Sequence, residues 1–271
     1  MDIADKVIII TGGASGIGKA LARKFSAEGG KIVIADINEK RLKIVSNQLN
    51  CEGNLCDVTD EKQIQFLIES VNTKLGPVDI FVSNAGTILG ETSHAASATD
   101  CIWNQCWQLH VMSHVYAARS LLPGMIKRKN GCFLQIISAA ALLSQIGDSA
   151  YSATKQAALG FAESLAISHK MDGIQVSVAC PQYVATDMLG YSESALAYRP
   201  KTVLTPDEVA ESIIIGLKKE HFLILPHQEV YQYMKFKSSK YNKWIDQMSK
   251  LRTSALKKST TLDIKKLHKF I

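Results

Sequence analysis

Two residues four positions apart, Tyr151 and Lys155, have the types and spacing for proton transfer. On a helix this separation puts both side chains on one face, one turn apart. A phenol ordinarily ionises near pH ~10, and an ammonium group beside it favours the phenolate and lowers that pKa. Such a pair can exchange a proton with an alcohol near neutral pH. Because a half-buried tyrosine and a solvated lysine also occur at this spacing, the remaining elements of the chain must supply the other reactants.

A glycine-rich turn near the N-terminus has the context of a phosphate-binding loop. Residues 6–11 form a β-branched run that predicts a buried strand, and a helical pattern through Phe25 follows the glycines. Glycines allow close backbone approach, and a helix N-terminus offers N–H groups and a positive dipole end. This pattern favours a dinucleotide site over a simple tight turn. The residues expected to contact the pyrophosphate are Gly12, Ser15, Gly16, Ile17 and Gly18.

The second predicted strand, residues 31–36, ends in an acidic residue, Asp36, 18 residues after Gly18. A carboxylate here can accept hydrogen bonds from both hydroxyls of an adenosine ribose and would repel a 2′-phosphate. The glycine loop contains no Arg or Lys, and Ile37 follows the acid, which favours NAD over NADP. The alternative is that Asp36 caps the helix that starts near Asn38.

Strand and helix patterns alternate through most of the remaining sequence. This order predicts an α/β fold in one domain, a doubly wound parallel sheet with helices on both faces. We divide the chain into a nucleotide-binding and catalytic domain, residues 1–226, and a basic helical extension, residues 227–271. The later strand segments lie at 54–58, 79–83, 132–138, 175–180 and 222–225, and the helices at 60–75, 103–129, 151–171 and 206–219.

Composition excludes several other classes of protein. The 271 residues suffice for one large α/β domain with its own core. No apolar run approaches the ~20 residues of a membrane span. The first residues lack a secretion signal, and the six cysteines form no Cys-x-x-Cys pair. We therefore expect a cytoplasmic protein with reduced cysteines.

The basic charge belongs to the C-terminal end. Residues 235–271 contain eleven Lys and Arg against two Asp, a net charge of +9, which leaves −3 for residues 1–234 of the overall +6. Nucleic-acid binding by the main domain is not expected. The tail pattern predicts an amphipathic helix packed on this subunit or its neighbour, with a lipid-surface contact as the alternative, and poor order over 253–271. The residues at helical spacing are Tyr233, Tyr241, Trp244, Ile245, Met248 and Leu251.

Together these motifs resemble the short-chain dehydrogenase/reductases, specifically their single-domain, classical type, over roughly residues 5–225. The resemblance implies a seven-stranded parallel sheet. It also implies hydride transfer between a nicotinamide and an alcohol or carbonyl carbon. The matching motifs are Thr11-Gly12-x-x-x-Gly16-x-Gly18, Asp57, Asn84-Ala85-Gly86, Ser138, Tyr151-x-x-x-Lys155, Pro181 and Thr186.

The resemblance also implies a role for each matching residue. Ser138 would hydrogen-bond the substrate oxygen, and Tyr151 would exchange the proton. Lys155 would bind the nicotinamide ribose and lower the Tyr151 pKa. The other implied cofactor residues are Asp36 and Ile37 near the adenosine ribose, Asp57 and Val58 at the adenine, Asn84, Ala85 and Gly86 in the cleft, and Pro181, Val184 and Thr186, the last at the carboxamide end.

Two positions depart from the family pattern. Many members have an Asn, seven residues after a Trp, that is thought to hold a water in a proton relay to the Lys. Counting from Trp103 gives His110, whose imidazole can hydrogen-bond a water and is our candidate for that role. Gln182 replaces the Gly that usually follows the Pro. His110 and His114 have the spacing of metal ligands, but the motif lacks its Glu and a third ligand, so no metal is expected.

The substrate pocket is expected between residues 139–149, the neighbourhood of Leu89 and residues 182–198, which have the pattern of a mobile apolar lid. Because these segments lack clustered Arg, we expect a lipophilic secondary alcohol or ketone, steroid-like or an oxygenated fatty chain. The resemblance implies a homodimer or homotetramer. The alternative function is a non-catalytic NAD-binding regulatory protein of the same fold. The small residues expected on one side of the Tyr151 helix are Ala153, Ala157, Ala158 and Gly160.

Overall fold

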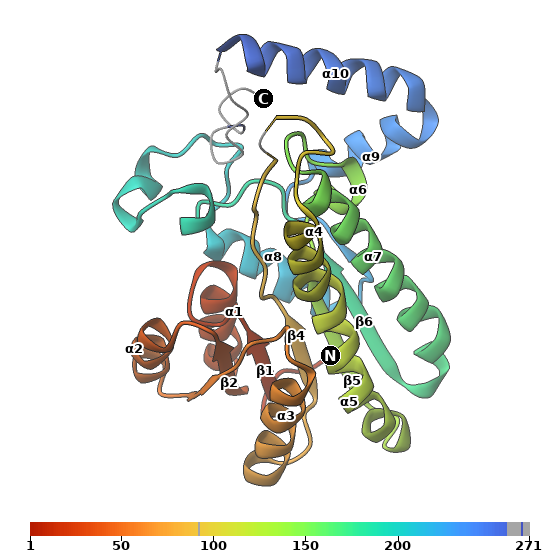
Figure 1. Ribbon diagram of the computed structural model, residues 1–271. Coiled ribbons are helices and arrows are strands. Elements are labelled where there is room, and N and C mark those ends of the chain that lie inside the picture. The colour runs from red at the N-terminus through yellow and green to blue at the C-terminus, as the bar shows by residue number, and fades with distance from the viewer. Residues whose placement is uncertain (92, 259–266, 268–271) are drawn as a thin grey trace.

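A seven-stranded parallel sheet lies at the centre of the computed structural model, which describes residues 1–91, 93–258 and 267 (Figure 1). The strand order is β3-β2-β1-β4-β5-β6-β7, and every neighbouring pair is parallel. The predicted doubly wound fold is therefore confirmed. The order reverses between β1 and β4, where such sheets bind ligands. The strands are β1 (Val7–Thr11), β2 (Lys31–Asp36), β3 (Glu52–Leu55), β4 (Ile80–Ser83), β5 (Gly131–Ile136), β6 (Ile174–Ala179) and β7 (Leu223–Ile224).

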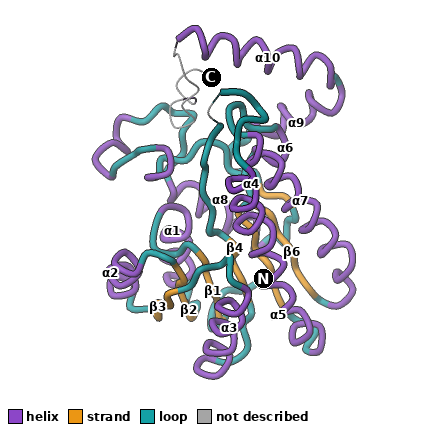
Figure 2. Tube along the Cα trace, viewed as in Figure 1, coloured by secondary structure: helices purple, strands orange, loops and turns teal. Residues whose placement is uncertain are grey.

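Helices cover both faces of the sheet (Figure 2). Helices α3, α5 and α7 pack on one face, and α1, α2 and α8 pack on the other. The helices are α1 (Gly16–Ala27), α2 (Glu39–Leu49), α3 (Glu61–Leu75), α4 (Asp100–Trp107), α5 (Ser113–Lys127), α6 (Ala140–Leu143), α7 (Ser149–His169), α8 (Pro206–Lys218), α9 (Glu229–Ser239) and α10 (Tyr241–Lys258).

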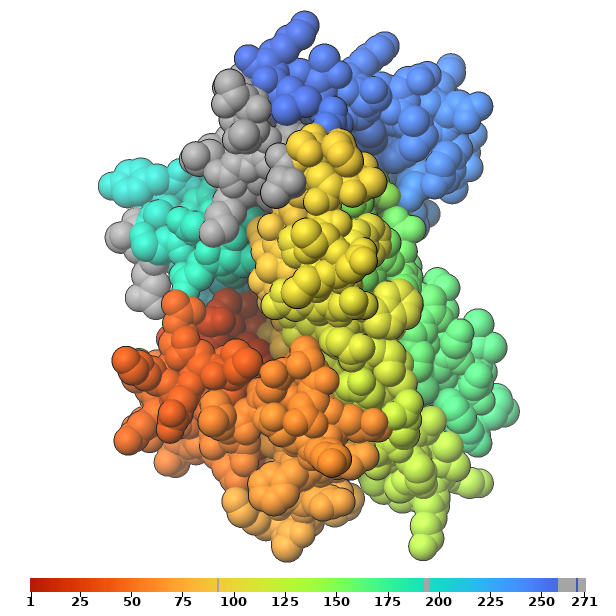
Figure 3. Space-filling view, viewed as in Figure 1, coloured from red at the N-terminus to blue at the C-terminus, as the bar shows by residue number. Residues whose placement is uncertain are grey.

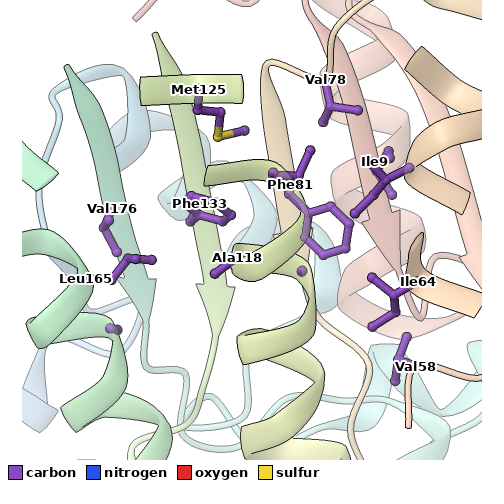
Figure 4. Packing of buried hydrophobic residues seen from close by; sticks show 14 of the residues in the cluster. Ile9, Val58, Ile64, Val78, Phe81, Ala118, Met125, Phe133, Leu165 and Val176 are labelled. Carbon is purple, nitrogen blue, oxygen red and sulfur yellow. The ribbon is translucent and has the colours of Figure 1, made fainter. Parts of the chain in front are cut away.

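The core explains why the strand sequences are continuously apolar. Ile9, Phe81, Phe133 and Val176 are paired in register across β1, β4, β5 and β6, and they form one apolar row under α5 and α7 (Figure 4). The residues between them point to the opposite face, where they pack under α1 and α8. Both faces of each central strand are buried, so little alternation remains in the sequence.

The segment predicted as one helix, residues 103–129, is helical as far as Lys127, but it is not one regular α-helix. Helix α4 passes into a π-helical turn, η1 (Gln108–Met112), before α5 begins. The Ser113 hydroxyl donates a hydrogen bond to the Leu109 carbonyl oxygen at 2.6 Å within this region. A π turn accommodates one extra residue per turn and changes the direction of the side chains that follow. His110 lies in this turn and is fully buried.

The C-terminal residues form α9 and α10, which pack beside α6 at one end of the molecule (Figure 1). Trp244 is 7% exposed in a cluster with Leu143 and Val230, and Lys237 Nζ donates to the Leu142 carbonyl oxygen at 2.7 Å. The expected packing on the same subunit thus holds for Trp244 and Met248, whereas Tyr233, Tyr241 and Ile245 are exposed. Residues 253–258 continue α10, and poor order over 253–271 stays a prediction; except for Leu267, the residues beyond lie outside the described part.

The division of the chain at residue 226 stays a prediction. Within the described part of the chain, no helix has both the length and the apolar character needed to cross a membrane.

Candidate active site

A cavity of about 590 Å³ opens at the carboxyl ends of β1, β4 and β5, between the N-terminal segments and the segment that precedes α4 (Figure 3). Its size suits a small-molecule site. Gly18 and His110 are the two predicted site residues outside its lining. Those that line it are Ser138, Tyr151, Lys155, Gly12, Ser15, Gly16, Ile17, Asp36, Ile37, Asp57, Val58, Asn84, Ala85, Gly86, Pro181, Val184 and Thr186.

The glycine loop fits a dinucleotide pyrophosphate. Gly12 and Gly16 have φ angles of +62° and +50°, which favour glycine. A Cβ atom on Gly18 would lie 2.2 Å from the Gly12 carbonyl oxygen and 2.5 Å from Asn84 Nδ2. Helix α1 begins at Gly16, and within the described residues the Ser15 side chain does not cap it. Gly16 and Ile17 line the cavity, so the first N–H groups of the helix are available there as donors for an anion.

The carboxylate of Asp36 is fixed at the end of β2. Its Oδ2 accepts a hydrogen bond from the Ala14 N–H at 3.1 Å, and its Oδ1 accepts one from the Asn38 N–H at 2.9 Å. The helix-capping alternative for Asp36 is wrong, because the Asn38 side chain caps α2 by accepting from the Arg41 N–H. Ile37 is 69% exposed beside this carboxylate.

The remaining cofactor-side residues shape the cavity. Asn84 Nδ2 donates to the carbonyl oxygens of Thr11 and Gly12 at 2.9 and 3.1 Å, so the end of β4 holds the start of the glycine loop. Asp57 Oδ1 accepts hydrogen bonds from the backbone N–H and hydroxyl of Thr59.

The catalytic candidates meet where β5 ends and α7 begins. Asp148 caps α7, which places Tyr151 in its first turn and Lys155 one turn further on the same face. Ser138 Oγ accepts a hydrogen bond from the Ala140 N–H at 3.1 Å and also hydrogen-bonds Tyr151. Lys155 Nζ lies 5.5 Å from the centroid of the Tyr151 ring. The predicted Ser, Tyr and Lys set is thus brought together on one wall of the cavity.

Burial dominates the ionisation of this pair. It raises the pKa of Tyr151 to about 12, although the Ser138 hydrogen bond acts in the opposite direction. Burial also lowers the pKa of Lys155 to about 8. The expectation of a lowered Tyr151 pKa is therefore wrong for the protein by itself, because desolvation of the phenol outweighs the Ser138 hydrogen bond and the negative charge of Asp148 raises the pKa further.

His110 lies behind the pair and is held by two protein partners. Its Nε2 accepts a hydrogen bond from the Thr87 N–H at 3.3 Å, and its Nδ1 lies 3.0 Å from Thr154 Oγ1. Because the Thr154 hydroxyl donates to the Ala150 carbonyl oxygen, we assign the proton to Nδ1 of His110. Burial, with the nearby Lys155 charge, lowers the His110 pKa to about 2. Both nitrogens have protein partners, and a role of His110 in a water relay stays a prediction.

The ring of His110 instead packs edge-on against Tyr151, with ring centroids 5.3 Å apart. His114 Nδ1 lies 2.9 Å from Gln135 Oε1, and burial lowers the His114 pKa to about 4. In the described part of the chain, no three His, Cys, Asp or Glu residues gather where they could hold a metal ion.

The far end of the cavity has the expected segments and some that the sequence analysis missed. Leu89 and Gln182 were expected there and are present. Gln105 and Leu109 were missed; they lie one turn apart, and that spacing just before His110 was the available signal. The predicted lid, residues 182–198, contains two 3-10 turns, Asp187–Leu189 and Glu193–Tyr198. Its first residue is held because the Gln182 N–H donates to His227 Nδ1 at 3.1 Å. Its mobility stays a prediction.

Comparison with known proteins agrees with this geometry. A sequence model of the short chain dehydrogenase family matches residues 6–197. Short-chain dehydrogenase/reductase family 16C member 6 of Bos taurus is 30% identical over 236 residues, covering 83% of this chain and 73% of the relative. Epidermal retinol dehydrogenase 2 of Mus musculus is 29% identical, with 83% and 75% covered. The 3-oxoacyl-(acyl-carrier-protein) reductase of Escherichia coli is 30% identical, with 69% and 77% covered.

Solved structures share the fold. A short-chain dehydrogenase/reductase from Burkholderia phymatum in complex with NAD superposes with a TM-score of 0.80 at 23% identity, covering 89% of this chain and 96% of that one. The chain therefore belongs to the short-chain dehydrogenase/reductase family. Members of this family are nicotinamide-dependent oxidoreductases that act on CH–OH groups of small molecules, and this chain is an enzyme of that class.

Proposed function

We propose that this enzyme interconverts a secondary alcohol and a ketone with NAD, on a neutral lipophilic substrate. The observation that carries the proposal is the shared cavity: Ser138, Tyr151 and Lys155 line one wall, and the glycine loop and Asp36 line its continuation. A nucleotide bound along the loop would thus reach the pair that exchanges protons.

The lining of the far end supports the substrate class. Leu89, Leu109 and Met188 supply apolar surface, and Gln105 and Gln182 add neutral polar groups. Lys155 is the only cationic side chain among the described residues that line the cavity, which disfavours a polyanionic substrate. The name of the mouse relative, a retinol dehydrogenase, supports the lipophilic character of the substrate; retinol is a primary alcohol, so the name does not bear on the choice of a secondary one.

The choice of NAD is based on Asp36. Its carboxylate, fixed by two backbone N–H groups, can receive ribose hydroxyls and would repel a 2′-phosphate. The structural relative from Burkholderia phymatum was solved with NAD. Comparison of kcat/KM for NAD and NADP tests this choice, and equal values would contradict it.

In the proposed oxidation, the chain's own residues place and move one proton. The Ser138 hydroxyl, whose oxygen already accepts the Ala140 N–H, donates its proton toward the substrate oxygen. The Tyr151 phenolate, which the nearby Lys155 ammonium stabilises, takes the alcohol proton and becomes the neutral phenol as hydride leaves the carbon. Bound NAD⁺ would supply the hydride acceptor and a positive charge beside the site. Ketone reduction is the reverse.

Replacement of Tyr151 by Phe tests the proposal. The variant should bind NAD with unchanged affinity in calorimetry and lose at least about a hundredfold in turnover, the range of a positioned acid-base group. Wild-type protein that binds NAD but oxidises no alcohol from a panel of steroids, retinoids and hydroxy fatty chains would favour the alternative, a non-catalytic regulatory protein. Turnover restricted to small polar polyols would contradict the substrate class.

A homodimer or homotetramer and a cytoplasmic location remain predictions. Ala153 and Gly160 of α7 are exposed, and space around Gly160 is open, which supports a contact surface there. Ala158 belongs to the core and not to that surface. Light scattering tests the oligomer.

A further inference from the structure

Two loops, residues 87–91 and 144–148, lie next to each other beside the catalytic pair. Asp148 is buried where they meet, with 1% of its surface exposed. Its Oδ1 accepts a hydrogen bond from the Tyr151 N–H at 3.0 Å. Its Oδ2 accepts one from the Gly90 N–H at 2.9 Å and one from the Leu89 N–H at 3.2 Å. One carboxylate therefore joins the first turn of α7 to the loop that carries Leu89.

Further hydrogen bonds flank this carboxylate on both sides. The Glu91 N–H donates to the Gly147 carbonyl oxygen at 3.0 Å, and the Ser149 N–H donates to Glu91 Oε2 at 3.3 Å. Gly90 and Gly147 have φ angles of +77° and +81°, so each loop turns sharply where it faces the other. The contact between the two loops is therefore an ordered junction, with hydrogen bonds on both sides of Asp148.

The other end of the same loop is also fixed. The Thr87 N–H donates to His110 Nε2 at 3.3 Å, and the His110 ring contacts Tyr151. Residues 87–90 are thus held at both ends, and Ile88 and Leu89 between these ends line the cavity. A displacement of this loop would be transmitted to the turn of α7 that bears the Tyr151 hydroxyl.

We propose that Asp148 is a positioning residue for the oxidoreductase reaction, because its carboxylate fixes the substrate-facing Leu89 loop relative to Tyr151. The inference rests on the proposed function of the same cavity. Its charge also acts on the phenol: the negative carboxylate contributes to the raised pKa of Tyr151. The charged or titratable groups around Tyr151 are Asp148 at the N-cap of α7, Lys155 on α7, His110 on η1, Cys106 on α4 and Cys180 after β6.

Replacement of Asp148 by Asn separates this role from helix capping. Asn caps helices about as well as Asp, so its amide oxygen can keep the Tyr151 N–H while its NH₂ group faces the N–H groups of Leu89 and Gly90. The variant should therefore release the loop and keep the helix. Asp172→Asn, which removes a carboxylate at the other end of α7, is the matched control.

Three readouts are expected to change in Asp148→Asn and not in Asp172→Asn. Hydrogen exchange at the amides of Leu89 and Gly90 should accelerate by about tenfold or more, the effect of losing charge-assisted hydrogen bonds. The substrate KM should rise by about tenfold with NAD affinity unchanged. The rate of alcohol oxidation should rise at lower pH than in wild type, because removal of a negative charge lowers the pKa of Tyr151, which acts as the base.

The outcomes separate the possible roles. If exchange, KM and pH profile all match wild type, while Asp148→Ala loses only thermal stability, Asp148 is a helix cap and the inference fails. Faster exchange without a change in KM and pH profile also overturns it. If wild-type protein oxidises no alcohol, the proposed function fails, and faster loop exchange in Asp148→Asn would then still establish the junction but not its catalytic role.

Discussion

Mild acid should destabilise this protein through two histidines buried in its centre. His110 is 0% exposed and His114 is 2% exposed. Burial lowers their pKa values to about 2 and about 4. In the unfolded chain both would titrate near pH ~6.5. Below that pH the unfolded state binds more protons than the folded state. The free energy of unfolding is therefore highest above pH ~6.5 and decreases as the pH falls.

The magnitude follows from this difference in proton binding. Each histidine costs about 1.4 kcal/mol for every pH unit below ~6.5, which gives about 2 kcal/mol each at pH 5 and about 4 kcal/mol for the pair. His227, whose pKa is lowered by burial, acts in the same direction. A loss of this size is a large part of the free energy of unfolding of an ordinary domain.

Urea unfolding at pH 7 and pH 5 measures the effect. The His110→Asn and His114→Gln variants should each lose about 2 kcal/mol less between the two pH values than wild type, since each removes one buried base. His94→Asn, at an exposed position, is the control and should behave as wild type. If both buried-site variants lose as much stability as wild type on acidification, the histidines are not the cause and the reasoning is refuted.

Three further substitutions test other parts of the site. Lys155→Met should abolish turnover and stabilise the protein at pH 7 by about 3 kcal/mol in urea unfolding. The reason is that burial lowers the Lys155 pKa from 10.5 to about 8 and so disfavours its charged form. A less stable variant would contradict this. Asp36→Ser should weaken NAD binding by about tenfold or more, as expected for lost charge-assisted hydrogen bonds, and reduce the preference for NAD over NADP. Calorimetry measures both affinities, and an unchanged ratio between them would contradict the role of Asp36. Gly160→Trp, on the open side of α7, should reduce the mass measured by light scattering, and an unchanged oligomer would remove Gly160 from the interface.

The sheet was predictable because each strand can be recognised from its local sequence pattern. Residues 7–11 and 31–36 are nearly continuous apolar runs, the pattern of parallel strands buried on both faces. The cofactor side was predictable for a related reason, since Asp36 and the glycines stand at the strand ends that meet at one edge of the sheet.

The features that were missed depend on contacts distant in sequence. The π turn at His110 interrupts a helical pattern that reads continuously, and it is held by Thr87 and Thr154 from two other segments. The predicted direction of the Tyr151 pKa shift was wrong, because helical spacing indicates the neighbouring ammonium but not how deeply the phenol is buried. Asp148 was overlooked because a cap three residues before a tyrosine gives no hint of the loop it also holds.

Burial acts on both members of the catalytic pair in a way that suits the proposed reaction. It favours the neutral form of each, so the phenol keeps its proton while the Lys155 ammonium is held at a cost. In ketone reduction, a negative charge forms on the substrate oxygen and then on Tyr151 as hydride arrives and the proton is given up, and the ammonium near the ring gains an anionic partner in a poorly solvated site. That attraction is weak in the resting state and strong as charge develops. An interaction of this kind lowers the barrier, since it stabilises the transition state more than the ground state.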